Sequence, residues 1–180
     1  MKIPTIETLF KITGVLEESN LGYWLDGGTL LGITRNGTLI PGDTDLDLGI
    51  YSIEWAQNQA LFERALAEAG MTFNTTNSRK AGISYSPNGK LEWIDLWKFN
   101  YRQRKYGDGL GEYYHQAWGG TFTWPEQHLK TLDKIVLLDH VLYVPHDPEG
   151  YLTVLYGPDW HTPKKLCKPR DYANWKKNVY

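Results

Sequence analysis

The sequence predicts a mixed α/β fold, with a mixed β-sheet flanked by helices in a single compact domain over residues 1–180. Two long segments place apolar residues at helical spacing, and several shorter segments alternate polar and apolar residues as half-buried strands do. A length of 180 residues with 41% hydrophobic residues is typical of one globular domain. No linker, internal repeat or low-complexity segment divides the chain.

The first quarter of the chain predicts a helix, a short strand and a second, brief helix. Helical spacing of apolar residues covers residues 5–20, and residues 23–25 follow as a strand. Gly27 and Gly28 then turn the chain into a brief helix over residues 29–34. A strand, a glycine turn and the N-terminus of a helix together form an anion site, because the first amides of a helix point outward without partners.

The remainder of the chain predicts strands joined by turns and two further helices. We expect strands over residues 45–51, 71–76, 81–85, 91–99, 134–138 and 141–144, and helices over 53–69 and 148–156. Gly70 and Gly157 end these two helices. Residues 100–120 lose the periodic pattern and are expected to form a glycine- and tyrosine-rich loop.

Composition narrows the range of partners. A formal charge of −2 and a pI near 6.2 provide no basic field for nucleic acid. One cysteine excludes an intramolecular disulfide, and the scattered histidines, expected at the surface or at caps, form no zinc motif. No apolar run reaches the length of a membrane span, so we expect a cytoplasmic protein without a transmembrane segment.

Three aspartates at alternate positions close the segment DGGTLLGITRNGTLIPGDTDLDLG. Asp45 and Asp47 lie in a predicted strand and project to the same face, with Asp43 in the turn before it. Asp95 lies in the middle of the predicted strand EWIDLWKF, where a buried carboxylate needs a partner. Carboxylates gathered in this way favour binding of Mg²⁺ or Mn²⁺. Two ions bridged by shared carboxylates can stabilise the in-line displacement at a phosphoryl group.

Other interpretations of these residues remain open from the pattern alone. The segment PGDTD is compatible with a solvated turn, and Asp95 with a hydrogen-bonded core residue. A calcium loop would use Asp43, Asp45 and Asp47 with Glu54 at its twelfth position, but its sixth position, which requires glycine, is Leu48.

The segment WLDGGTLLGITRNGTLIPGDTDLDLGI resembles the hallmark of the LicD family, which includes phosphocholine transferases and fukutin-type ribitol-phosphate transferases. The usual form of that hallmark is close to GGTLLGxxRxGxxIPWDDDxD, and the later block YVPHDPEGYLTVLYGPDWHTP is also similar to the family. Gly42 and Thr44 stand where the family commonly has Trp and Asp, but the alternate aspartates are intact. The resemblance implies one LicD-like domain with a nucleotidyltransferase-like sheet.

The resemblance also implies a reaction and its partners. Family members move a phosphorylated small alcohol from a CDP-linked donor to a hydroxyl of a glycan, polyol or glycan precursor and release CMP. Asp45 and Asp47 would hold the metal, Mg²⁺ or Mn²⁺, and possible participation of Asp43 is left open. Asp95 would ligate a metal and accept the proton of the attacking hydroxyl.

Donor binding is expected at the glycine turn. The amides after Gly27 and Gly28 would cradle phosphate oxygens, Thr29 would add a hydroxyl, and Arg35 would reach the donor phosphates with its planar guanidinium. A surface ion pair explains Arg35 equally well. Two other functions stay open: a nucleotidyltransferase that attacks the α-phosphate of a nucleoside triphosphate and releases pyrophosphate, and a non-catalytic glycan- or nucleotide-binding module.

Overall fold

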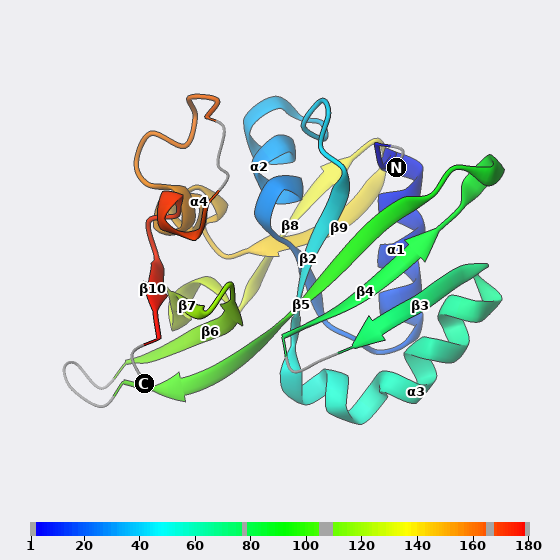
Figure 1. Ribbon diagram of the computed structural model, residues 1–180, viewed down its shortest axis with the longest axis horizontal. Coiled ribbons are helices and arrows are strands. Elements are labelled where there is room, and N and C mark those ends of the chain that lie inside the picture. Colours follow the sequence, from blue (N-terminus) through cyan, green and yellow to red (C-terminus); the bar gives the residue numbers. More distant parts are fainter. Residues whose placement is uncertain (1–2, 77–78, 105–109, 165–167, 179–180) are drawn as a thin grey trace. The chain divides into compact units, whose positions relative to one another are not determined.

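The computed structural model describes residues 3–76, 79–104, 110–164 and 168–178. The chain divides into two compact units. The first contains Met1–Lys98 and Lys134–Val144, and the second contains Phe99–Asp133 and Pro145–Tyr180. Helices and sheets are mixed along the chain, which confirms the predicted fold class (Figure 1).

The first unit is built on a sheet with the strand order β1-β2-β5-β4-β3. Its strands are β1 (Tyr23–Leu25), β2 (Asp45–Tyr51), β3 (Met71–Thr76), β4 (Lys80–Tyr85) and the part of β5 (Glu92–Gln103) up to residue 98. β1 is antiparallel to β2, and β4 is antiparallel to both β3 and β5. A 3₁₀ turn, η1 (Pro87–Gly89), joins β4 to β5.

Three helices accompany this sheet: α1 (Ile6–Glu18), α2 (Gly27–Asn36) and α3 (Ser52–Glu68). α3 packs against β2, β3 and α1, whereas α2 packs against β2. The apolar stripe of α1 is fully buried because its residues recur at helical spacing, and Thr5 caps the helix by accepting from the Thr8 amide at 3.2 Å. A separate hairpin of β8 (Leu132–Leu137) and β9 (His140–Pro145) confirms the predicted pair of strands.

The second unit has its own sheet and an aromatic core. The last residues of β5 pair with β6 (Gly111–Ala117), which pairs with β7 (Gly120–Pro125), and β7 pairs with β10 (Trp175–Lys177). The 3₁₀ turns η2 (Glu126–His128) and η3 (Pro169–Asp171) and the helix α4 (Pro148–Tyr156) complete it. Trp124 stacks on Tyr151 of α4, with 5.1 Å between ring centroids. Asp147 caps α4 through the Gly150 amide, and α4 ends at Gly157, as predicted.

The loop predicted over residues 100–120 is wrong. β5 continues to Gln103 and β6 covers most of the second half of that segment, while residues 105–109 lie outside the described residues. Cross-strand pairs stabilise this hairpin: Arg102 lies opposite Glu112 and forms an ion pair with it at 2.5 Å. The alternation is hidden in the sequence because the outward positions carry tyrosines and charges, while β6 begins on a glycine.

Two histidines correct the expectation that histidines lie at the surface or at caps. His115 and His128 are buried in the second unit. The ring of His115 stacks on Phe122 with 4.9 Å between ring centroids, and burial lowers its pKa from 6.5 to about 3. His115 therefore serves as a neutral core residue. Among the described residues, no helix combines the length and the apolar character required to cross a membrane.

Candidate active site

Three aspartate side chains from two neighbouring strands gather in the first unit. Asp45 and Asp47 belong to β2 and Asp95 to β5, and one carboxylate oxygen of each lies within 4.8 Å of the others. Residues two apart on a strand face the same side of the sheet. Asp95 is 3% exposed, whereas the other two are half-buried. The structure thus brings together the three carboxylates that the sequence singled out.

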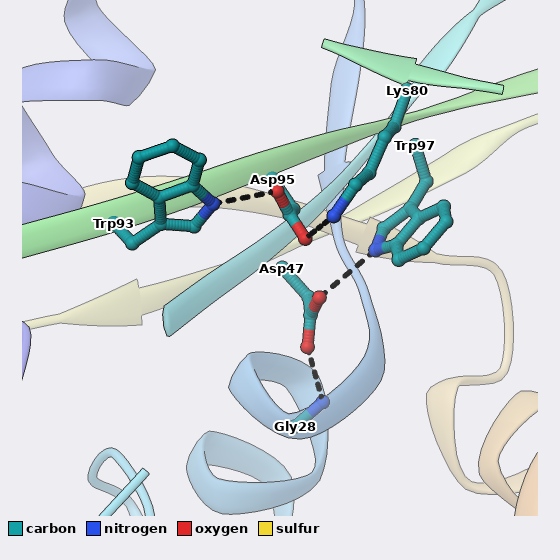
Figure 2. A network of polar contacts seen from close by, with 6 residues as sticks. All are labelled: Gly28, Asp47, Lys80, Trp93, Asp95 and Trp97. Atoms are coloured by element: carbon teal, nitrogen blue, oxygen red, sulfur yellow. Dashed lines mark hydrogen bonds and ion pairs between the residues drawn. The ribbon is translucent and has the colours of Figure 1, made fainter. Parts of the chain in front are cut away.

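Asp47 is held at both of its carboxylate oxygens (Figure 2). The Gly28 amide donates to Asp47 Oδ2 at 3.1 Å, and the indole Nε1 of Trp97 donates to Asp47 Oδ1 at 2.9 Å. The backbone amide of Asp47 in turn donates to Thr29 Oγ1 at 2.9 Å. These bonds fix the start of α2 against β2, so the position of the carboxylate is set by the helix and by the neighbouring strand together.

Asp95 is held by two side chains that share its face of the sheet. Trp93 Nε1 donates to Asp95 Oδ1 at 3.0 Å, and the ammonium of Lys80 forms an ion pair with Asp95 Oδ2 (Figure 2). The β4–β5 register places Gly82 opposite Asp95 and Lys80 opposite Trp97, so Lys80 approaches Asp95 diagonally. Because Gly82 has no side chain, nothing from that position competes for the space beside Asp95.

The double glycine lets the helix start approach the carboxylates closely. Gly27 has a φ of +47°, a left-handed conformation that favours glycine, and an added Cβ would lie 2.6 Å from Asp47 Oδ2. A Cβ at Gly28 would lie 2.5 Å from Asp43 Oδ2. Side chains at either position would therefore displace an aspartate.

Burial raises the pKa values of Asp43, Asp45 and Asp47. Burial, followed by the nearby charges of Asp43 and Asp95, raises the pKa of Asp45 from 3.8 to about 6. Burial and then the charge of Asp45 raise the pKa of Asp47 from 3.8 to about 8. Burial also raises the pKa of Asp43. A bound cation would remove this repulsion, and the all-carboxylate donor set suits a hard divalent ion such as Mg²⁺ or Mn²⁺.

The calcium-loop alternative is wrong. Asp45 and Asp47 lie in a strand rather than in a loop, and Glu54 lies in α3, where its Oε2 accepts from the Gly22 amide at 2.7 Å. The loop that would wrap around a calcium ion is therefore absent from this described part of the chain.

Comparison with known sequences identifies the family. The family described as LicD/FKTN/FKRP, nucleotidyltransferase domain, matches residues 20–147. The chain belongs to this family. Its membership confirms the resemblance, and the matched span includes the glycine turn, the aspartates of β2 and Asp95.

Relatives of this LicD-family chain include the ribitol 5-phosphate transferase FKRP of Mus musculus and that of Homo sapiens. Each is 31% identical over 163 residues, which cover 84% of this chain and 31% of the relative. The chain thus spans about a third of the length of these relatives. An uncharacterised protein of Rickettsia typhi is 28% identical over 159 residues, covering 88% of this chain and 47% of that protein. These two relatives are named as transferases of ribitol 5-phosphate.

Two solved structures are similar in backbone. ANT(2″)-Ia in complex with adenylyl-2″-tobramycin aligns with a TM-score of 0.48 and 15% identity, over 78% of this chain and 68% of that chain. The CdnE cyclic dinucleotide synthase of Elizabethkingia meningoseptica with GTP and Apcpp aligns with a TM-score of 0.42 and 13% identity, over 89% of this chain and 56% of that chain.

The segment between α2 and β2 forms one side of a pocket beside the carboxylates. Asp43 and Asp45 line it together with Gly28, Thr29, Leu39 and Ile40 and with Ile3 and Pro4 from the start of the chain. Asp43 accepts from the Thr44 amide at 3.0 Å and lies at the edge of the cluster. The lining of the pocket therefore combines carboxylates with apolar side chains.

Arg35 is separated from the carboxylates by the length of α2. It lies in the last turn of α2, at the end opposite the carboxylates, and its Nε donates to Asn36 Oδ1 at 2.8 Å. The hydroxyl of Thr29 is buried and accepts from the Asp47 amide, and the Gly28 amide donates to Asp47. Binding of donor phosphates by Gly27, Gly28, Thr29 and Arg35 thus stays a prediction.

Sequence reasoning overlooked the side chains that hold the carboxylates. Trp93 and Trp97 flank Asp95 at alternate positions of β5, so all three share one face of the sheet. That spacing was a usable signal, since an indole N–H next to a buried carboxylate is a natural hydrogen-bond donor. Lys80 and Asp26, a buried residue whose charge helps to raise the pKa of Asp47, had no comparable local signal.

Proposed function

We propose that this chain transfers a phosphorylated small alcohol, such as phosphocholine or a polyol phosphate, from a CDP-linked donor to a hydroxyl of a glycan, polyol or glycan precursor, with release of CMP. The observation that carries the proposal is the approach of the Asp45, Asp47 and Asp95 carboxylates to within 4.8 Å, beside the start of α2. Membership of the LicD/FKTN/FKRP family supports the reaction class.

Asp45, Asp47 and Asp95 would hold Mg²⁺ or Mn²⁺, which would neutralise the diphosphate and the leaving CMP. Asp95 is also the candidate base for the acceptor hydroxyl, because a carboxylate within hydrogen-bond reach can accept the proton as the oxygen attacks phosphorus. Trp93, Trp97 and the Gly28 amide hold the carboxylates in place through their hydrogen bonds. The carboxylates are therefore in position before the donor binds.

The pocket beside Asp43 and Asp45 is the proposed position for part of the donor. Its apolar residues Leu39 and Ile40 would contact an uncharged portion of the donor, while Gly28 and Thr29, which are hydrogen-bonded to Asp47, line the pocket beside the carboxylates. We also propose that residues 1–180 act as one LicD-like domain. The cytoplasmic location expected from the sequence stays a prediction.

The experiment is a comparison of donors with product detection. The protein is incubated with Mg²⁺, a panel of CDP-linked alcohols or, separately, nucleoside triphosphates, and polyol or sugar acceptors, and the release of CMP or pyrophosphate is measured. We expect CMP release that stops with EDTA and that Asp45→Asn lowers about a thousandfold. Asp139→Asn removes an exposed aspartate at φ +65°, a conformation that Asn tolerates, and is expected to retain the wild-type rate.

Pyrophosphate release from a nucleoside triphosphate, with no CMP release from any CDP-linked donor, would replace this proposal with the nucleotidyltransferase alternative. Equal product release by wild type and Asp45→Asn would contradict both functions, because both depend on the same carboxylate cluster.

A further inference from the structure

Lys80 places a positive charge directly against the carboxylate cluster. Its ammonium is paired with Asp95 Oδ2, and the same nitrogen lies 4.9 Å from the centroid of the Trp97 ring (Figure 2). The Trp97 indole N–H in turn donates to Asp47 Oδ1 at 2.9 Å. Lys80 thus contacts one aspartate directly and lies over the ring that holds another.

The surroundings of Lys80 fix this arrangement. Its side chain is 34% exposed, whereas that of Asp95 is 5% exposed, so the lysine pairs with a carboxylate that is almost shielded from solvent. The β4–β5 register sets Lys80 opposite Trp97 and leaves only Gly82 opposite Asp95. Asp95 Oδ1 already accepts from Trp93, and Lys80 occupies the other oxygen. Each Asp95 oxygen therefore already accepts a hydrogen bond from a protein side chain.

The position of the ammonium has a consequence for metal binding. A divalent ion that bound at Asp95 Oδ2 would lie directly against the positive charge of Lys80. Two cations at such short range repel, so a second ion at this oxygen is unfavourable in the protein without donor.

We infer that Lys80 is a positioning residue that takes the place of a second metal ion, so that the cluster binds one divalent ion. The ammonium orients Asp95 and balances its charge while the carboxylates share the single ion. This inference rests on the proposed function. The alternative arrangement for that function is a pair of metal ions bridged by the aspartates.

The test counts metal ions on the donor-free protein. Wild type, Lys80→Met and Lys80→Arg are titrated with Mn²⁺, and free Mn²⁺ is measured by electron paramagnetic resonance. We expect one bound ion per chain for wild type and for Lys80→Arg, which keeps the charge. We expect two for Lys80→Met, which keeps an apolar stem over Trp97 but frees Asp95 Oδ2. Lys11→Met is the matched control, because Lys11 also lies over an aromatic ring, that of Tyr85, but makes no contact with the aspartates. It is expected to bind one ion.

Two bound ions in wild type would overturn the inference, as would equal numbers in wild type and in Lys80→Met. If Lys80→Met does not fold, a count of two for wild type or for Lys80→Arg would still overturn it. CMP release by a wild type that binds two ions would leave the proposed function standing. A folded wild type that binds no Mn²⁺ and releases no CMP would instead remove the proposed function itself.

Discussion

The indole N–H of Trp97 donates to Asp47 across neighbouring strands, at 2.9 Å from Nε1 to Oδ1. This bond connects β5, which also carries Asp95, to the aspartate on β2, so the relative position of two candidate ligands depends on one tryptophan. Outer hydrogen bonds of this kind orient the groups that contact a metal.

Trp97→Phe should therefore weaken the site while keeping an aromatic ring in the same space. We expect Mn²⁺ affinity and turnover to fall about 10- to 100-fold, the usual loss when a partner of a metal ligand is removed. Isothermal titration with Mn²⁺ and the CMP-release rate measure these effects. Trp118→Phe, at a half-exposed tryptophan of the second unit, is the control. Unchanged Mn²⁺ affinity in Trp97→Phe would show that the indole N–H does not position Asp47.

Asp45→Asn and Asp47→Asn should differ in stability although both should lose activity. Each substitution removes a negative charge from the cluster, and we expect turnover to fall on the order of a thousandfold. Without metal, Asp45→Asn should melt at the same or a higher temperature, because repulsion is relieved. Asp47 accepts from Gly28 and Trp97 at its two oxygens, so an amide there turns one NH₂ toward a donor, which costs about 1–3 kcal/mol.

Calorimetry of both variants in EDTA provides the comparison, with circular dichroism to verify folding. A lower melting temperature for Asp45→Asn than for Asp47→Asn would show that the hydrogen bonds at Asp47 contribute less than the relief of repulsion.

The stability of the metal-free protein should decrease as the pH rises. The folded pKa values of Asp45 and Asp47, about 6 and about 8, lie above the ordinary value of 3.8, so the folded state binds more protons than the unfolded chain between these values. The contribution of these groups is full below 3.8 and is lost as the pH rises through about 6 and about 8. Saturating Mg²⁺ should oppose this trend, because the ion binds the ionised carboxylates.

Melting temperatures from pH 5 to 8.5 at constant ionic strength, in EDTA and in Mg²⁺, test this expectation. Asp47→Asn should show a shallower decrease in EDTA than wild type. A metal-free wild type that becomes more stable between pH 6 and 8 would contradict the assignment of raised pKa values to this pair.

Local sequence patterns were sufficient to predict most of the first unit and α4 of the second unit. The alternation in DLDLGIY predicted β2 with its bounds, and Pro148 with Gly157 marked both ends of α4. The spacing of Asp45 and Asp47 gave their shared face, because side-chain direction in a strand has a period of two. The pairing with Asp95 was less direct, since it depends on β2 and β5 being neighbours in the sheet.

Features that depend on tertiary contacts could not be predicted from local sequence patterns. The contact between Lys80 and Asp95 depends on the β4–β5 register, and burial of His115 depends on aromatic neighbours on the adjacent strands β5 and β7. The place of Arg35 in the family hallmark suggests a phosphate ligand, a role that stays a prediction, and the structure places this residue in the last turn of α2.

Gly28→Ala should lower activity in a protein that still folds, which tests whether the start of α2 has a role in the reaction. The added Cβ would lie 2.5 Å from Asp43 Oδ2, and Asp43 lies in the turn before β2, next to the pocket, so this carboxylate must move. Gly28 itself has no positive φ, so the backbone accepts alanine without strain. We expect the variant to fold, with turnover at least about tenfold lower because the donor subsite and the cluster edge have shifted.

Gly14→Ala is the matched control for this substitution. Gly14 lies in α1, and a Cβ there would meet nothing within 4 Å, so the change should stabilise the protein by about 0.5–1 kcal/mol through helix propensity and leave turnover unchanged. Chemical denaturation and CMP release are measured for both variants. Wild-type turnover by a folded Gly28→Ala protein would show that close approach of α2 to Asp43 is not needed. If the loss of activity is explained by a loss of folded protein, Gly28 is needed for folding rather than for the reaction.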